Sequence, residues 1–311
     1  MAFLPDGDVL LTHRLSALDC VEQVLMSHAN PPLASRDVVP DGSVVFLGPQ
    51  LGIGGEGFVV IAGPCAVEGR EQVSDCADLV RRGGAGALRG GGFKPRTSPY
   101  DFQGLGIEGV RMLAEAGREV GLPVVTEVVE PGHARLVAEH ADMLQIGTRN
   151  AQNFSLLAAV AETGLPVLLK RGFGCTIKEW LYAAEYVLAR GNPNVVLCER
   201  GIRTFEGATR FTLDLSAVPM VKQLSHLPVL VDPSHGTGNR GLVEPMALAA
   251  AAAGADGLLI DVHSDAATAR CDADQALRPA EWLHFADRLA KLLTGLGRPL
   301  LAPLPAFPVG P

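Results

Sequence analysis

The feature that most constrains this chain is an alternation of short apolar runs with longer segments of helical periodicity. The runs are rich in Val, Ile and Leu, which is typical of strands buried on both faces of a parallel sheet. The segments between them have the length of crossover helices. Eight such runs occur, at residues 58–62, 87–91, 123–128, 143–147, 166–171, 195–201, 228–232 and 257–262.

Eight consecutive strand–helix units predict an α/β protein of the (β/α)8 TIM barrel class. A doubly wound open sheet is the alternative. It is disfavoured because no G-x-G-x-x-G turn follows an early strand. The chain has 311 residues, of which 48% are hydrophobic, so it can bury the core of one large domain.

The two ends of the chain differ in character from the barrel. An apolar stripe at helical spacing predicts one amphipathic helix before the break at Pro31–Pro32; its members are Leu15, Leu18, Val21 and Leu25. The segment from 44 to 57 predicts a hairpin. After residue 297 the five prolines indicate an irregular extension. We therefore expect an N-terminal helix and hairpin extension, a barrel and a Pro-rich C-terminal tail, at residues 1–57, 58–295 and 296–311.

Composition excludes several classes of partner. The net charge is -8 and no basic run is present, which argues against binding to nucleic acid or to an anionic membrane. Six cysteines are spread along the chain without C-x-x-C spacing, so neither a disulfide scaffold nor a zinc ribbon is expected. No apolar stretch reaches the ~20 residues that cross a bilayer. We expect a cytoplasmic protein with small-molecule partners.

Polar side chains gather where the apolar runs end. Side chains at the carboxyl ends of barrel strands point into the mouth of the barrel, where such proteins bind ligands. Because many of these residues are cationic in an acidic protein, we expect an anionic ligand, and two phosphorylated molecules rather than one. Arg171 and Arg203 have an alternative role as structural partners of Glu199 or Glu206. The strand-end residues are Cys65, Arg89, Lys94, Glu127, Arg149, Lys170, Arg200, His235 and Asp261.

The segment from Lys94 to Tyr100 follows the second predicted strand. Its two prolines stiffen the backbone, so its polar side chains can present donors to a phosphate at low entropic cost. A solvated surface turn is the alternative. The candidate phosphate donors are Lys94, Arg96, Thr97 and Ser98.

A possible metal site combines one thiol, one imidazole and two carboxylates. These residues are Cys65, His235, Asp261 and Asp272. Such a set suits a borderline divalent metal ion such as Mn, Fe, Co or Zn. The alternative is that Cys65 is a core thiol and that the aspartates lie on the surface.

From Phe58 to Leu277 the chain resembles the short bacterial class I (beta-type) 3-deoxy-D-arabino-heptulosonate 7-phosphate (DAHP) synthases, a family shared with 3-deoxy-octulosonate 8-phosphate synthase. The resemblance rests on six motifs in order, which are jointly far more specific than any one of them. They are Ala62–Glu68, Lys94–Tyr100, Gln145–Asn153, Lys170–Gly172, Cys198–Thr204 and Asp232–His235.

This resemblance implies condensation of phosphoenolpyruvate with erythrose 4-phosphate, the first step of the shikimate pathway to the aromatic amino acids. It assigns the phosphoenolpyruvate site to Arg89, Lys94, Arg149, Lys170 and Arg200. It assigns the aldose phosphate to Arg96, Thr97 and Ser98. It implies catalytic roles for Lys94, Glu127, Cys65 and His235.

The resemblance also implies a divalent metal ion held by Cys65, His235 and Asp272, and a homodimer or homotetramer. Asp261 stands where the family carries a glutamate ligand. Two other functions stay open: an octulosonate 8-phosphate synthase that uses arabinose 5-phosphate, and a weakly active barrel kept for binding or regulation. The sister family has Asn-Arg-Ser in the phosphate loop, so Pro95 and Thr97 favour the four-carbon aldose.

Overall fold

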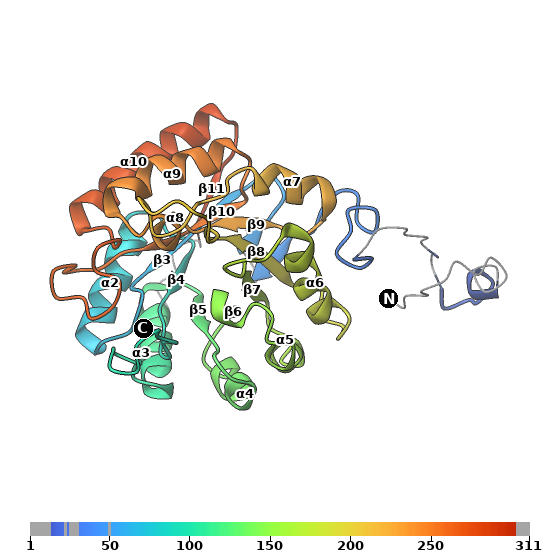
Figure 1. Cartoon of the computed structure of the whole chain (residues 1–311), viewed down its shortest axis with the longest axis horizontal. Coiled ribbons are helices and arrows are strands. Elements are labelled where there is room, and N and C mark those ends of the chain that lie inside the picture. The colour runs from blue at the N-terminus through green and yellow to red at the C-terminus, as the bar shows by residue number, and fades with distance from the viewer. Residues whose placement is uncertain (1–13, 22–23, 25–30, 49–50, 303–311) are drawn as a thin grey trace, which may run out of the picture.

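The computed structural model describes residues 14–21, 24, 31–48 and 51–302. Eight parallel strands follow one another around a closed barrel, and β10 pairs with β3 to complete the ring (Figure 1). The predicted (β/α)8 barrel is confirmed, and each predicted apolar run matches one strand, with β3 extending one residue beyond its run. The strands are β3 (Phe58–Gly63), β4 (Ala87–Arg89), β5 (Val124–Glu127), β6 (Met143–Ile146), β7 (Val167–Lys170), β8 (Val195–Glu199), β9 (Val229–Val231) and β10 (Gly257–Asp261).

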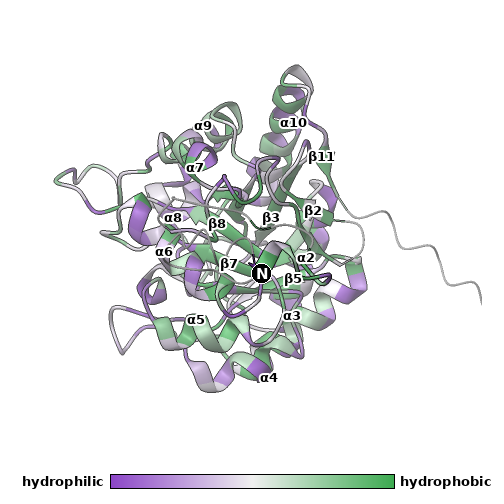
Figure 2. Cartoon of the chain, turned by 90° about the vertical axis from the view of Figure 1, so that its right-hand side faces the viewer, coloured by the Kyte–Doolittle hydropathy of each residue, from purple (hydrophilic) through white to green (hydrophobic). Residues whose placement is uncertain are grey.

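The strands are buried on both faces, which explains their continuous apolar sequence. Along β3, Val59 and Ile61 face the barrel interior, whereas Phe58 and Val60 pack against the surrounding helices. Figure 2 shows the strands β7 and β8 in the green of hydrophobic residues, with purple polar residues spread over the outer helices. The core therefore has two layers, one inside the barrel and one between barrel and helices.

The helices lie outside the strands and join them. Four of the described helices, α5, α6, α8 and α9, have an N-cap side chain that accepts a backbone N–H. At α6, Thr176 and Glu179 form a capping box, and at α8 the carboxylate of Asp232 accepts the His235 N–H. No helix among the described residues is both long and apolar enough to span a bilayer. The helices are α2 (Arg70–Arg82), α3 (Ile107–Val120), α4 (Ala134–Ala138), α5 (Phe154–Ala161), α6 (Ile177–Leu188), α7 (Ala217–Leu224), α8 (Pro233–Thr237), α9 (Arg240–Ala252) and α10 (Pro279–Gly295).

The predicted hairpin is present as antiparallel strands β1 (Val45–Leu47) and β2 (Leu51–Ile53). Its apolar side chains join the cluster that fills the barrel interior. Ser43, two residues before β1, donates its N–H to the carbonyl of His226, which precedes β9. The hairpin thus covers the amino-terminal end of the barrel, opposite the strand ends that carry the polar residues.

The predicted N-terminal helix is not continuous in the described residues. Only residues 14–16 are helical, residues 17–20 form turns and a bend, and Leu25 lies outside the described residues. Leu18 is 49% exposed, so the apolar stripe is not buried there.

The predicted irregular tail contributes one short strand. β11 (Leu300–Leu301) pairs in parallel with Phe58 and Val59 at the start of β3. Its Leu301 side chain packs where Gly57 has no side chain, because a Cβ there would lie 2.2 Å from Leu301 Cδ1. Arg298 strengthens this contact by donating to the Ala255 and Gly57 carbonyls. Residues 303–311 of the tail lie outside the described residues.

Candidate active site

A cavity of about 300 Å³ opens at the carboxyl ends of the barrel strands. Among the described residues, three acidic side chains line it, those of Asp101, Glu127 and Asp272. The cationic side chains are far more numerous, which agrees with the predicted local cleft for anions. They are Arg89, Lys94, Arg96, Arg149, Lys170, Arg200, Arg203 and Arg210.

The predicted phosphate loop borders this cavity through Pro95, Arg96 and Thr97. The Thr97 hydroxyl accepts a hydrogen bond of 2.9 Å from Arg149 Nη2, so the loop and the end of β6 are in direct contact. Ser98 does not line the cavity, and its hydroxyl instead accepts the Tyr100 N–H. The structure therefore brings together all the predicted loop donors except Ser98.

Glu127 ends β5 and is almost completely buried in the cavity wall. Gln145, on the neighbouring strand β6, donates to Glu127 Oε2 at 3.2 Å. Gly147 gives the carboxylate room, because a Cβ at that position would lie 2.0 Å from Glu127 Oε1. These contacts fix the carboxylate at the base of the cavity. Gln145 and Gly147 were not predicted individually, although both fall within the third motif.

Lys170 and His235 share one buried carboxylate, that of Asp232. Lys170 Nζ lies 2.6 Å from Asp232 Oδ2, and His235 Nδ1 lies 2.9 Å from the same oxygen. Asp232 is completely buried, follows β9 and also caps α8. Asp232 was not predicted as a site residue, although it begins the last of the six motifs. The signal that could have found it is its place before Pro233, at an N-cap three residues ahead of the histidine.

The neighbouring carboxylates change the pKa of the His235 imidazole. Burial alone would lower the pKa of His235, but the carboxylates of Asp232 and Asp261 outweigh burial and raise that pKa to about 10. In the absence of a competing cation the imidazole is therefore protonated at neutral pH. Its Nδ1 faces Asp232, and its Nε2 faces Cys65 and Asp272.

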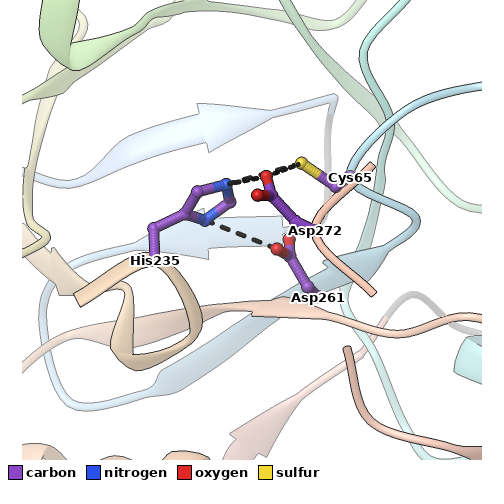
Figure 3. A group of neighbouring side chains, drawn as sticks. All are labelled: Cys65, His235, Asp261 and Asp272. Carbon is purple, nitrogen blue, oxygen red and sulfur yellow. Dashed lines mark hydrogen bonds and ion pairs between the residues drawn. The ribbon is translucent and has the colours of Figure 1, made fainter. Parts of the chain in front are cut away.

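The four predicted metal ligands lie together (Figure 3). One potential ligand atom from each of Cys65, His235, Asp261 and Asp272 lies within 4.8 Å of the others. Cys65 Sγ is 3.5 Å from His235 Nε2 and 3.0 Å from Asp272 Oδ2, and these last two atoms are 3.6 Å apart. Ligand atoms about 2.0–2.3 Å from a shared zinc-like ion are spaced by roughly 3.3–3.8 Å. The donor set therefore fits a divalent metal ion.

Asp261 is held differently from the other three residues. Its Oδ1 lies 2.5 Å from Arg89 Nη1, and its Oδ2 accepts a hydrogen bond of 2.6 Å from Gln275 Nε2. The nearest imidazole atom recorded for it is His235 Nδ1, at 3.5 Å. Asp261 thus belongs to the group but approaches the histidine from the side opposite to Nε2.

A second thiol, which sequence reasoning did not select, lies in this group. Cys271 Sγ is 3.6 Å from Cys65 Sγ and 3.5 Å from Asp272 Oδ2, and it contacts the Arg96 guanidinium. The hydrogen bond between the two thiols lowers the pKa of Cys271 and raises that of Cys65, which burial raises further. The only signal in the sequence is that Cys271 directly precedes Asp272.

Phe173 and Phe211 form an aromatic platform beside the arginines. The guanidinium carbons of Arg149, Arg200 and Arg203 lie 5.6, 5.3 and 4.7 Å from the centroid of the Phe173 ring. Arg200 also lies over Phe211, at 4.1 Å, and burial lowers the pKa of Arg200 to about 10. The platform was not predicted, because lone phenylalanines carry no distinctive pattern.

Arg171 and Arg203, for which a structural role was the alternative, behave differently. Arg171 pairs with buried Glu199 at 2.8 Å and with Asp214 at 3.0 Å, so its role is structural. Arg203 lines the cavity. The structural alternative therefore holds for Arg171 alone.

Comparison with known proteins agrees with this geometry. The model of the DAHP synthetase I family matches residues 44–295. A phospho-2-dehydro-3-deoxyheptonate aldolase of Thermotoga maritima is 46% identical over 297 residues, covering 96% of this chain and 88% of the relative. A crystal structure of the T. maritima enzyme, described as DAHP synthase, superposes with a TM-score of 0.85 at 45% identity, covering 96% of this chain and 87% of that one. A 2-dehydro-3-deoxyphosphooctonate aldolase of Syntrophobacter fumaroxidans is 33% identical, over 72% of this chain and 83% of its own length. The chain belongs to the DAHP synthetase I family.

Proposed function

We propose that this protein is a 3-deoxy-7-phosphoheptulonate synthase, a transferase that condenses phosphoenolpyruvate with erythrose 4-phosphate and water to give DAHP and phosphate. The observation that carries the proposal is the 46% identity to the T. maritima enzyme across 96% of this chain. The eight cations around one cavity support it, because both substrates are phosphorylated. The product would enter the shikimate pathway to the aromatic amino acids.

Phosphoenolpyruvate would occupy the inner part of the cavity. The cations at the ends of β4, β7 and β8 can hold its carboxylate and phosphate, with Lys94 and Arg149 completing the shell. Arg89 and Lys170 are already oriented by buried carboxylates, so little side-chain entropy remains to be lost on binding. The proposed residues are Arg89, Lys94, Arg149, Lys170 and Arg200.

The aldose phosphate would bind at the outer loop. Arg96 and Thr97 line the cavity there, whereas Ser98 is bonded within its own turn and would have to reorient to contact the phosphate. A loop stiffened by Pro95 and Pro99 sets the distance between the bound phosphate and the aldehyde. We propose that this distance selects the four-carbon sugar.

A divalent ion would be held by Cys65, His235 and Asp272, with Asp261 beside them. When bound, such an ion supplies Lewis acidity to the aldehyde oxygen. The protein's own groups hold the methylene carbon of phosphoenolpyruvate against the aldehyde carbon, which converts a bimolecular encounter into an oriented one. Water then adds at the former enol carbon that carries the phosphate, and phosphate leaves.

Lys94 and Glu127 are placed to handle protons in this reaction. Lys94 Nζ lies 3.2 Å from Cys65 Sγ at the boundary between the proposed metal group and the cavity. From there it can donate a proton to the alkoxide oxygen that develops from the aldehyde. Glu127 also lines the cavity, and its carboxylate can accept the proton that the attacking water loses. Replacing Lys94 with Met should therefore lower kcat far more than it raises KM.

The decisive assay follows the loss of phosphoenolpyruvate with each aldose phosphate, with metal added and with metal chelated. We expect turnover with erythrose 4-phosphate and a much smaller kcat/KM with arabinose 5-phosphate. The reverse preference would identify an octulosonate 8-phosphate synthase instead. No turnover with either sugar in the metal-loaded protein would leave a barrel that serves only binding or regulation. We further propose a cytoplasmic homodimer or homotetramer, which light scattering of the purified protein would test.

A further inference from the structure

The metal group contains more potential ligands than it needs, and they are not equally available. Cys65, His235 and Asp272 direct Sγ, Nε2 and Oδ2 toward one another. Two further residues compete for the next position, the carboxylate of Asp261 and the thiol of Cys271. The contacts of these two side chains distinguish them.

Asp261 is occupied elsewhere. One oxygen pairs with Arg89, which is itself only 3% exposed, and the other accepts from Gln275. Moving this carboxylate onto an ion at Nε2 would leave a buried guanidinium without its partner, which is unfavourable. The recorded contact of Asp261 with His235 is to Nδ1, the ring nitrogen that faces away from Cys65 and Asp272. Asp261 is therefore placed to orient Arg89 and Gln275.

Cys271 lies beside two of the three converging ligand atoms, Cys65 Sγ and Asp272 Oδ2. A tetrahedral ion with bonds of about 2.3 Å to sulfur and about 2.0 Å to oxygen separates two sulfurs by roughly 3.8 Å and sulfur from oxygen by roughly 3.5 Å. Cys271 Sγ lies 3.6 Å from Cys65 Sγ and 3.5 Å from Asp272 Oδ2. Its side chain is buried beside these two atoms.

The surrounding charges match a set of three anionic ligands. Lys94 contacts Cys65, Arg96 contacts Cys271, and Arg210 Nη1 lies 3.2 Å from Asp272 Oδ1. Each anionic ligand atom thus belongs to a side chain that has its own cationic neighbour. Such outer partners stabilise thiolate and carboxylate ligands. Two thiolates and a carboxylate around one divalent ion would otherwise leave an excess negative charge in a buried site.

We propose that Cys271 is a metal ligand, so that the ion is held by Cys65, Cys271, His235 and Asp272, with Asp261 outside the set. This inference rests on the proposed function for the presence of an ion. Each thiol releases its proton to solvent when its sulfur binds. Two thiolates select thiophilic ions such as zinc over manganese. Because zinc can expand to five ligands, the four protein ligands still leave a position for the aldehyde oxygen.

The test is the number of sulfur atoms around bound zinc, measured by X-ray absorption on the purified full chain. We expect two sulfurs at about 2.3 Å in the wild type and one in Cys271→Ser. Cys175→Ser is the matched control, since it removes a thiol outside the cluster and should keep two. Asp261→Asn should also keep two sulfurs. One sulfur in the wild type overturns the proposal, whatever the variants do.

Competition titration adds an independent measure of affinity. Cys271→Ser should weaken zinc binding at least as much as removal of an outer partner does, which is roughly 10- to 100-fold, while manganese binding changes little. Equal loss for both ions, or no loss for zinc, contradicts a thiolate ligand. Neither measurement depends on turnover: a two-sulfur site in a protein inactive toward erythrose 4-phosphate refutes only the proposed reaction, and a one-sulfur site in an active protein refutes only this inference.

Discussion

Replacing Asp232 with Asn should damage stability and the site together. Asp232 is fully buried, and its Oδ2 lies 2.6 Å from Lys170 Nζ and 2.9 Å from His235 Nδ1. Its side chain also caps the first turn of α8. Asn keeps the helix cap, since Asn and Asp cap equally well, but loses the negative charge. Removing one partner of a buried ion pair costs about 3–5 kcal/mol. Because the amide oxygen still accepts one hydrogen bond, we expect a loss of about 3 kcal/mol for Asp232→Asn and about 1 kcal/mol more for Asp232→Ala.

The assay is urea unfolding of the metal-free protein, combined with zinc titration of the folded protein. Loss of the carboxylate behind His235 should weaken metal binding roughly 10- to 100-fold, as for other partners of metal-bound histidines. Asp256→Asn is the control: Asp256 is 1% exposed, lies 2.7 Å from Lys222 Nζ and sits before β10, at the opposite end of the barrel. It should lose stability but keep metal affinity. If Asp232→Asn unfolds within about 1 kcal/mol of wild type and binds zinc normally, the shared-carboxylate reasoning is wrong.

Phe173→Ala should raise KM for the phosphorylated substrates by about 10-fold or more, because three cation–π contacts of roughly 0.5–1 kcal/mol each are lost. Phe173→Tyr keeps the ring, so its KM should stay near that of the wild type. Equal KM values in the two variants would show that the platform plays no part in binding. Chelation of the metal should abolish turnover and readdition should restore it, so full activity in a metal-depleted sample, checked by elemental analysis, would show that no ion is required. Because the pKa of His235 in the folded protein is raised to about 10, its positive charge adds to the free energy of unfolding of the metal-free protein. This contribution is complete below pH ~6.5 and is lost as the pH rises through 10. The free energy of unfolding of His235→Gln should not show this decline with pH.

The strands of the barrel could be predicted because their sequence depends on burial alone. A run such as Val195 to Glu199 is covered on both faces, and its composition records this directly. The helical stripe around Leu18 is a different case: amphipathic spacing shows that a helix could bury one face, but not that a surface is available, and Leu18 is 49% exposed. Periodicity thus predicted most reliably the elements that are buried in the core.

Most residues that line the cavity were predicted from the sequence, whereas several of the pairs that they form were not. Cations at strand ends could be placed in the barrel mouth because the fold determines where those ends lie. The partner of Lys170, in contrast, is 62 residues away, and the partner thiol of Cys65 is 206 residues away. Such contacts depend on the closure of the barrel and on loop conformation, so no local sequence pattern predicts them. Asp272 illustrates this, since it adopts a φ of 53°, which is uncommon for a residue other than glycine.

The pairing of β3 has a consequence for how the chain folds. The first half of β3 pairs with β11 and the second half with β4, and its other edge pairs with β10, which begins about 200 residues later in the chain. The first strand of the barrel therefore has no complete set of neighbours until the last has been made. Contacts this distant in sequence slow folding, because the entropy of loop closure is lost before the stabilising contact has formed. During synthesis on the ribosome the ring can therefore close only after residue 261 has emerged, and the first half of β3 gains its last partner only when residue 301 follows.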